Sequence, residues 1–137
     1  MGSLKRLKIT LIFLKGIRGI LELLLEILMS LYKKYLDVYS NWDLETFKNI
    51  HHEDYMFVRE TDLLTRDEHV DSFAKLSVDP NWNWDWFKAV EVLYEDEHVL
   101  LTRWEDKGDI VTNTSIIKDG LCWRAIVVRN PKNSQTF

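Results

Sequence analysis

The chain has 137 residues, of which 46% are hydrophobic, and a formal net charge of −4 at pH 7. This length suits one domain that can bury a core without disulfides or metals. Residues 1–28 hold five cations and two anions, a charge of +3, so the remainder carries −7. An acidic domain without a basic stripe excludes nucleic acid as a partner. The single cysteine, Cys122, excludes an intramolecular disulfide and fits a reducing, cytoplasmic location.

Residues 1–28 are an apolar segment in which Leu and Ile supply fourteen positions. Charges interrupt it too often for a membrane-spanning helix, which needs about 20 mostly apolar residues. Four of these charges lie three or four residues apart, so on a helix they form one narrow polar stripe: Lys15, Arg18, Glu22 and Glu26. The pattern predicts a long amphipathic helix that continues to about residue 41, with weak points at its two glycines.

Three interpretations of this extension stay open. Its broad apolar arc lies on a membrane surface, helped by the cations Lys5, Arg6 and Lys8. Alternatively, it packs against another subunit or against its own domain, or the native chain begins at Met29. The domain is expected to span residues 29–132, followed by a loose polar tail over 133–137.

The segment after the first helix carries the signals of two more helices and a strand. Asp43 is a good N-cap for a short helix that ends near His51. Residues 54–59 favour a strand. Residues 65–68 have the spacing of a capping box, which predicts a third helix to about Leu76.

Four segments in the second half have the character of strands: 87–95, 98–105, 109–117 and 121–129. Acidic or glycine-containing turns join them, as in an antiparallel meander. Helices first and strands afterwards predict an α+β domain in which helices cover one face of an antiparallel sheet.

Four segments, together with this order of elements, resemble the nuclear-transport-factor-2-like superfamily: 35–44, 50–58, 65–68 and 118–124. They are most similar to its SnoaL-like (polyketide-cyclase-like) branch. The resemblance implies an α+β fold with a cone-shaped, curved antiparallel sheet wrapped around N-terminal helices. It also implies a deep hydrophobic pocket for a small apolar ligand and a homodimer through the sheet.

The fold does not carry a single activity. Ketosteroid isomerases of this superfamily place a tyrosine on the first helix as an oxyanion donor, and Tyr35 lies at a similar place. Their general base would fall at or near Arg59 and their second carboxylate near Thr114, where this chain has no acid. The resemblance therefore implies that this isomerase chemistry is absent.

The catalytic candidates are Tyr35, as a hydrogen-bond donor to a ligand oxygen, and Asp54, as a working acid at the pocket mouth. Asp54 ends a polar cluster over 51–54 whose side chains are of the types that bind metals. Metal sites need side chains that converge from one face, whereas adjacent residues usually diverge. We therefore predict no metal and no cofactor.

The first ligand-binding candidates are three alternating tryptophans, Trp82, Trp84 and Trp86. In an extended chain they share one face. Three indoles on one face suit a pocket for a flat apolar ligand, a subunit contact, or core filling against the end of the sheet. All three interpretations stay open.

The remaining ligand-binding candidates are Arg103, Trp104 and Arg124, which lie on predicted strands where an arginine adjoins a tryptophan. Neighbours in a strand face opposite sides, so each pair offers one residue to the hollow. An inward arginine needs a carboxylate partner, such as Glu91, and favours an anionic or carbonyl ligand. An outward arginine is merely solvated.

Two functions from different classes fit these patterns. The first is a small-molecule-binding domain, with a lyase or isomerase acting on an apolar carbonyl compound as its enzymatic form. The rival is a non-catalytic interaction or oligomerisation module with an occluded pocket, whose N-terminal helix binds a partner or a membrane surface. A buried carboxylate facing Tyr35 across a cavity would favour the enzyme, and a hollow filled by large side chains would favour the rival.

Overall fold

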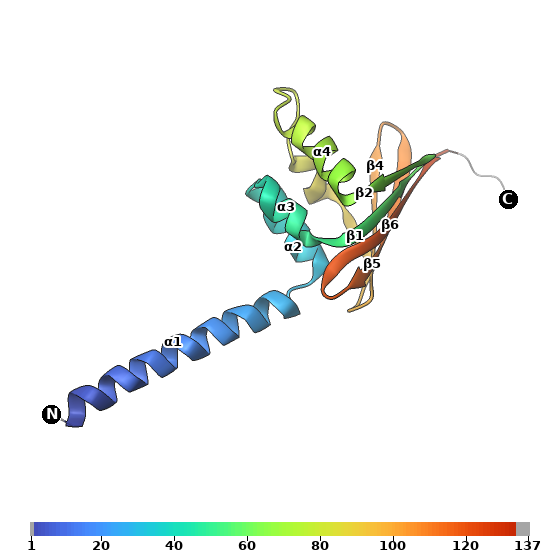
Figure 1. Cartoon of the computed structure of the whole chain (residues 1–137). Helices are drawn as coiled ribbons and strands as arrows, with labels where there is room; N and C mark the ends of the chain where they lie inside the picture. Colours follow the sequence, from blue (N-terminus) through green and yellow to red (C-terminus); the bar gives the residue numbers. More distant parts are fainter. Residues whose placement is uncertain (1, 134–137) are drawn as a thin grey trace.

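A computed structural model describes residues 2–133 of the chain (Figure 1). Its helices are α1 (Gly2–Leu28), α2 (Leu31–Ser40), α3 (Leu44–Ile50), α4 (Arg66–Ser77) and the 3-10 helix η1 (Asp85–Ala89). Its strands are β1 (His51–Arg59), β2 (Asp62–Thr65), β3 (Glu91–Glu95), β4 (Val99–Asp106), β5 (Asp109–Lys118) and β6 (Leu121–Pro131). The helices precede the last four strands, as the sequence predicts.

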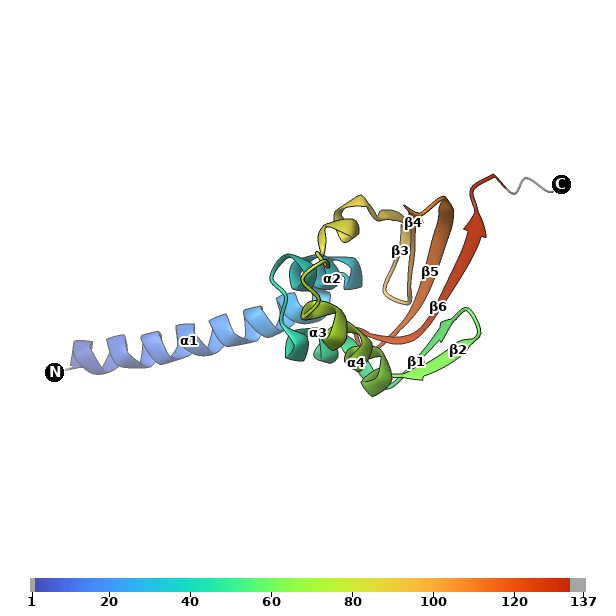
Figure 2. The ribbon, with the colours of Figure 1, turned by 90° about the horizontal axis from the view of Figure 1, so that it is seen from above.

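The strands form one sheet in the order β2-β1-β6-β5-β4-β3. Strands β3 to β6 pair as an antiparallel meander, as predicted. Strand β1 lies parallel to β6, so the sheet is mixed rather than wholly antiparallel. Figure 2 shows the sheet curving away from the helices α2, α3 and α4 that lie along one side of it. The predicted α+β fold class, with N-terminal helices against a curved sheet, is confirmed.

Two strands differ from the sequence prediction. Strand β2 was not predicted, because its four residues are too few to show a clear alternation. Strand β3 begins at Glu91 rather than at residue 87, because Asp85–Ala89 form a 3-10 helix. The three tryptophans at 82, 84 and 86 therefore do not share one face of an extended segment.

Side-chain caps explain where the helices of the domain begin. Ser30 Oγ accepts a hydrogen bond from the backbone nitrogen of Lys33 at 3.1 Å, so α2 starts as a new helix. The prediction of one continuous helix to residue 41 was wrong, since α1 ends before this cap. Asp43 caps α3 through the backbone nitrogen of Thr46 at 3.0 Å, and a capping box opens α4, both as predicted.

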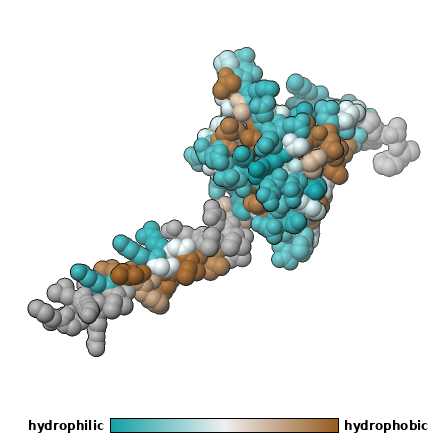
Figure 3. Space-filling model, viewed as in Figure 1, coloured by the Kyte–Doolittle hydropathy of each residue, from teal (hydrophilic) through white to brown (hydrophobic). Residues whose placement is uncertain are grey.

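Helix α1 extends away from the body of the domain and is unbroken at its two glycines (Figure 1). Its described apolar side chains are exposed, and Figure 3 shows much of its surface in brown: Leu11, Ile12, Phe13, Leu14, Ile17, Ile20, Leu21 and Leu24. Over residues 2–133, no helix combines the length and the apolar character needed to cross a bilayer. The partner of this exposed apolar surface, a membrane or a second subunit, stays a prediction. The predicted polar tail lies, from residue 134 on, outside the described residues.

The core lies between the sheet and helices α2, α3 and α4. Phe47 and Cys122 are fully buried, and the ring of Phe47 lies 4.7 Å from that of Phe73 and 5.2 Å from that of Trp42. Cys122 is a free thiol, and burial raises its pKa to about 11. The helices fill this side of the interior with aromatic rings and leave a hollow over the sheet.

Candidate functional site

A cavity of about 230 Å³ lies between the helices and the sheet. Every second residue of a strand faces the same side, so the sheet wall consists of cross-strand rows. The first row is buried throughout and joins Phe57, Ala125, Ser115 and Leu100. The second row joins Arg59, Val127, Asn113 and Thr102. The third row joins Arg129, Val111 and Trp104. The polar groups of the sheet wall therefore come from all four strands β1, β6, β5 and β4.

The opposite wall is mostly aromatic. Helix α2 contributes Tyr35 and Tyr39, α4 contributes His69 and Phe73, and η1 contributes Trp86 and Phe87. The rings of Tyr39 and Phe87 lie 4.7 Å apart, and Trp86 lies 5.4 Å from Trp104 of the sheet wall. Both ring pairs are in direct contact and tilted, by 53° and 48°, so they give the cavity an aromatic surface against which an apolar molecule can pack.

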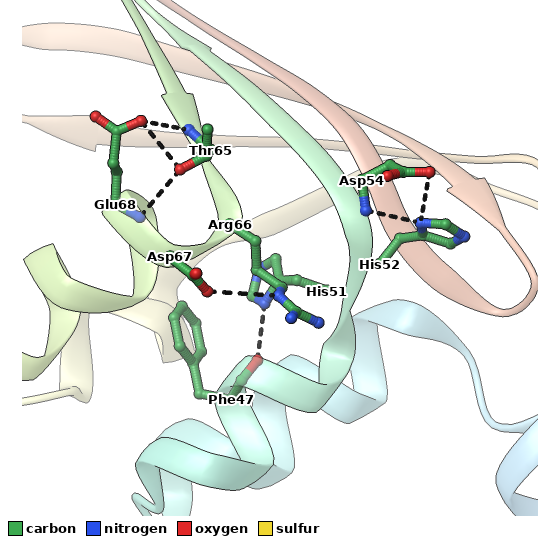
Figure 4. Close-up of polar contacts among 8 residues, drawn as sticks. All are labelled: Phe47, His51, His52, Asp54, Thr65, Arg66, Asp67 and Glu68. Carbon is green, nitrogen blue, oxygen red and sulfur yellow. Dashed lines mark hydrogen bonds and ion pairs between the residues drawn. The ribbon is translucent and has the colours of Figure 1, made fainter.

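His51, at the start of β1, makes two buried hydrogen bonds behind the cavity. Its Nδ1 lies 2.7 Å from the carbonyl oxygen of Phe47 (Figure 4), and its Nε2 lies 2.8 Å from the hydroxyl oxygen of Tyr35. A carbonyl oxygen only accepts, so Nδ1 carries the ring proton. In a neutral ring Nε2 must then accept the Tyr35 proton. Tyr35 therefore has no free proton for a ligand oxygen, contrary to the role predicted for it.

Burial keeps the titratable groups inside the cavity neutral at pH 7. It lowers the pKa of His51 to about 4, while the bond to Phe47 opposes this shift and the charge of Arg66 adds to it. Burial, with the charges of His51 and Arg59, also lowers the pKa of His69 well below its usual value. It raises the pKa values of the buried tyrosines in the wall. The interior thus offers hydrogen bonds but no charge.

Three polar atoms of the lining are buried and lack a hydrogen-bond partner: His69 Nδ1, Trp86 Nε1 and Asn113 Oδ1. The side-chain nitrogen of Asn113 donates to Ser115 Oγ at 3.5 Å, which leaves the amide oxygen unused. A buried polar group without a partner costs about 1–3 kcal/mol, and native proteins hold few of them. Three further atoms of this kind belong to residues that do not line the cavity: Arg66 Nε, Trp82 Nε1 and Trp123 Nε1.

The charged members of the lining are Arg59, Glu60 and Arg129. Arg129 is held by Asp106 at 2.8 Å, Asp109 at 3.3 Å and Glu60 at 3.5 Å. The Glu60 side chain is 59% exposed, so the described lining contains no buried carboxylate. The arrangement that would have favoured an enzyme, a buried acid facing Tyr35, is not present among these residues.

Three of the predicted site residues line the cavity: Tyr35, Trp86 and Trp104. The two remaining tryptophans of the alternating stretch lie elsewhere. Trp84 stacks on Trp42 with ring centroids 4.0 Å apart, and Trp82 meets Trp84 edge-on at 5.5 Å. They extend the aromatic core over α2 and do not line the cavity, because the chain at this point is a loop followed by η1.

The two predicted arginines do not line the cavity. On β4, alternation turns Trp104 inward and leaves Arg103 in an exposed ion pair with Glu91 at 3.0 Å. Arg124 lies over the ring of Trp123, with its guanidinium 4.1 Å from the ring centroid. Both arginines therefore make their contacts outside the cavity.

The polar cluster at 51–54 diverges, as adjacent residues in a strand do. His51 is 1% exposed, whereas the side chain of Asp54 is 71% exposed and lies 4.0 Å from Nδ1 of His52 (Figure 4). Asp54 does not line the cavity. In the part of the chain that the structure describes, no three His, Cys, Asp or Glu side chains gather closely enough to hold a metal ion.

Most of the polar side chains in the lining were not predicted from the sequence. Alternation along β5 places Val111, Asn113 and Ser115 on one face, which the predicted strand already indicated. These positions were not predicted to face the interior, because Asn and Ser residues usually face solvent. Thr114, the position considered for a second carboxylate, does not line the cavity, while its two neighbours do.

The buried histidines predict a loss of stability in mild acid. Between pH 6.5 and about 4, the unfolded chain protonates His51 and the folded chain does not. The free energy of unfolding should therefore fall as the pH drops through this range, by up to about 1.4 kcal/mol per pH unit for each such histidine. His69 acts in the same direction. Urea unfolding at pH 7, 6 and 5 measures this slope.

A matched pair of variants separates these histidines from the other acid-sensitive groups. The variant His69→Phe should flatten the slope, whereas the same change at exposed His98, whose side chain is 78% exposed, should leave it unaltered. Equal stability of the unmodified chain at pH 7 and pH 5 would contradict the assignment of neutral, buried histidines.

No protein-family model matches the chain, and no curated protein matches it. Among solved structures it is similar to an NTF2-like protein of unknown function from Burkholderia xenovorans LB400, with a TM-score of 0.49 and 9% identity over 74% of this chain and 80% of that one. It is also similar to a Kribbella flavida DSM 17836 protein provisionally assigned as a ketosteroid isomerase, with a TM-score of 0.48 and 16% identity over 73% and 75%. A third is a de novo protein from a set designed with diverse pocket structures, with a TM-score of 0.45 and 15% identity over 73% and 96%. At these identities, each likeness concerns the α+β fold and not an activity or a ligand.

Proposed function

We propose that the domain binds a small, flat, neutral and mainly apolar molecule in the cavity over the sheet. One observation carries this proposal: the lining combines aromatic rings with a few polar side chains, such as His69, Asn113 and Ser115. In small-molecule sites, apolar walls supply contact area and a few polar atoms fix the orientation. The same combination is present here.

The size and the charge of the cavity limit the ligand. An apolar cavity of about 150 Å³ holds benzene, so 230 Å³ has room for a ring with substituents. Drug-sized ligands occupy pockets of roughly 300–1,000 Å³. The charged lining residues Arg59, Glu60 and Arg129 are partly exposed and already ion-paired, whereas the buried lining side chains are neutral. Burying a charged group among these neutral side chains is costly. The ligand is therefore a neutral molecule built on one small ring system.

Thermal unfolding of the full chain in the presence of small aromatic compounds tests this proposal. A ligand at 100 times its dissociation constant adds about 2.7 kcal/mol to the free energy of unfolding. For a domain of this size that raises the melting temperature by several degrees. A panel of neutral single-ring compounds at millimolar concentration that produces no shift would contradict the proposal.

An enzymatic form of this function would depend on His69. Its ring lies in the cavity wall and is neutral at pH 7, because burial lowers its pKa well below the usual value, and a base must be neutral to take a proton from a bound molecule. A lyase or isomerase of the SnoaL-like branch, as the sequence resemblance implies, would use this histidine in place of a carboxylate. Asp54 is not available for that role, because it lies outside the cavity.

The rival function, an interaction module, is supported by one observation: the apolar arc of α1 is exposed. Its other premise, an occluded pocket, finds no support in a cavity of about 230 Å³. We therefore retain only the part that concerns α1, as a contact for a second subunit or for a membrane surface. This contact and ligand binding do not exclude each other, since none of the α1 side chains that the structure describes lines the cavity.

The outer face of the sheet supports a homodimer through the sheet. One row across five strands is largely apolar: Val58, Ile126, Thr114, Leu101 and Tyr94. Ile126 and Tyr94 are 50% and 54% exposed. An exposed apolar row of this kind is typical of a subunit contact.

Removal of residues 1–28 should leave the domain folded, with a melting temperature within about 2 °C of the full chain, because surface changes away from the core rarely exceed about 0.5 kcal/mol. Light scattering of residues 29–137 should give the mass of two chains, since the contact proposed for the sheet is retained. The full chain is the control in both measurements. A monomeric truncated protein beside a dimeric full chain would place the subunit contact on α1 instead.

A further inference from the structure

We propose that α1 lies flat on an anionic lipid surface, with its apolar side chains between the lipids and its cations among their headgroups. This inference rests on the part of the proposed function that concerns α1, and it names the partner that was left open there. None of the α1 side chains that the structure describes lines the cavity, so the lipid contact is independent of ligand binding.

The apolar side chains of α1 form a broad surface that the domain does not cover (Figure 3). Eight large apolar side chains of the helix are exposed, with exposed fractions from 36% for Ile17 to 70% for Ile12. A helix turns by about 100° per residue, so seven of the eight fall within an arc of about 200°, and Leu11 lies outside it. An exposed apolar surface of this kind marks a contact with a partner or a membrane.

The breadth of this arc favours lipid over a second copy of the helix. Two paired helices bury a narrow seam along each other. Phe13 lies at the centre of the arc and Ile12 and Leu14 at its two edges, so a helix packed against Phe13 would leave both edges in water. A helix at a lipid surface instead buries its whole apolar face, about 5–10 Å deep, at the boundary between headgroups and acyl chains.

The charges of the helix are those that an anionic surface attracts. The first 21 residues hold five cations and no acidic residue, since the first acid of the chain is Glu22. The cations whose side chains the structure describes are exposed and lie on the side of the helix away from the apolar arc: Lys8, Lys15 and Arg18. Basic residues near a membrane surface strengthen the attraction to anionic lipids, and their long stems let the charge reach the headgroups.

The length of α1 separates these cations from the acidic domain. Residues 29–137 carry −7, which the same lipids would repel. Helix α1 has 27 residues, so it is about 40 Å long, and it projects away from the domain (Figure 1). In physiological salt, exposed charges act over only about 8 Å. Met29 and Ser30 separate α1 from α2, so the helix can lie on the lipid while the domain stays in water.

Sedimentation of the full chain with lipid vesicles tests the proposal. One preparation contains phosphatidylcholine alone, and the other contains equal parts of phosphatidylcholine and the anionic phosphatidylglycerol. We expect about 10-fold tighter binding to the anionic vesicles. Raising the salt from about 0.1 M to about 1 M shortens the Debye length from about 10 Å to about 3 Å, so this preference should fall to about 2-fold or less.

Two variants of the same residue type test the apolar arc. Leu24 lies near its centre and Leu11 on the opposite side, and their exposed fractions are 46% and 52%. Glutamine forms helices about as well as leucine, so both variants keep α1 helical. Leu24→Gln should weaken binding to the anionic vesicles by about 10-fold, because it removes a leucine from the buried face. Leu11→Gln should stay within about 2-fold of the unmodified chain.

A third variant tests the cations. Neutralising two of them together, by Lys8→Gln and Lys15→Gln, should weaken binding to the anionic vesicles by about 10-fold. The same variant should leave the weaker binding to phosphatidylcholine unaltered, because the apolar arc is retained.

Equal binding of the Leu24 and Leu11 variants would overturn the proposal, because the apolar arc would then not face the lipid. Equal binding to the two kinds of vesicle, or no binding to either, would overturn it as well. Light scattering without vesicles then identifies the alternative, since an oligomer that Leu24→Gln dissociates would place a second copy on α1. None of these results concerns the cavity, whose ligand binding is measured without lipid.

Discussion

A phenylalanine in place of Val127 should abolish the binding of small aromatic molecules. Val127 lies in the second row of the sheet wall, paired with Asn113 on β5 and with Arg59 on β1. Its side chain lines the cavity, so a ring at this position occupies the space that a ligand needs. Extra bulk in a packed core costs about 1–3 kcal/mol, but here it enters a hollow, so the domain should remain folded. We expect at least about 100-fold weaker binding, or about 2.7 kcal/mol.

The adjacent residue provides the matched control. Ile126 is 50% exposed on the outer face of the same strand, so Ile126→Phe makes the same kind of change without touching the cavity. Thermal unfolding with and without 4-ethylphenol compares the two variants. The Ile126 variant should retain the ligand-induced rise in melting temperature. The same rise in the Val127 variant would show that the compound binds somewhere other than the cavity.

Replacing Phe47 by alanine should lower the free energy of unfolding by about 3–5 kcal/mol. Phe47 is fully buried, and its ring contacts those of Trp42, Phe73 and His51 at 5.2, 4.7 and 4.7 Å. The change removes the ring and leaves a hole that rigid aromatic neighbours cannot fill. The free energy of unfolding of a native domain is only about 5–15 kcal/mol, so this single substitution removes a large fraction of the stability.

Urea unfolding at pH 7 measures this loss, and Leu44 on the same helix is the control. Leu44 is 38% exposed, so Leu44→Ala should cost less than about 1 kcal/mol. If the Phe47 variant also loses less than about 1 kcal/mol, the aromatic cluster is not the core that supports the cavity wall.

The sequence predicted those elements whose signals act over a few residues. Asp43 caps α3, and the capping box at 65–68 opens α4, because side chain and backbone partners lie three residues apart. The last four strands follow from alternation and turn residues. The same local logic explains two errors. Ser30 is itself a cap and divides the long helix, and the turn of η1 interrupts the stretch of alternating tryptophans.

Only three residues of the candidate site were predicted from the sequence, and each was chosen for its own side-chain type. Tyr35, Trp86 and Trp104 were expected at a pocket and line the cavity. Arg103 and Asp54 were expected there and lie outside, because the sequence gives the alternation along a strand but not which face meets the helices. Thr102, Asn113 and Ser115 escaped attention for the complementary reason, since polar residues on a strand ordinarily face water.

The sequence by itself determined the α+β class and most of the helices and strands, since caps, turns and alternation act between residues close in the chain. Only the tertiary structure decided which side chains meet in the cavity, because β1 pairs in parallel with β6, far along the chain. It also decided the chemistry of those side chains. Burial keeps His51 neutral, and the carbonyl oxygen of Phe47 directs the proton of Tyr35 to His51. Burial and hydrogen-bond direction are properties of the packed interior, and no residue carries them alone.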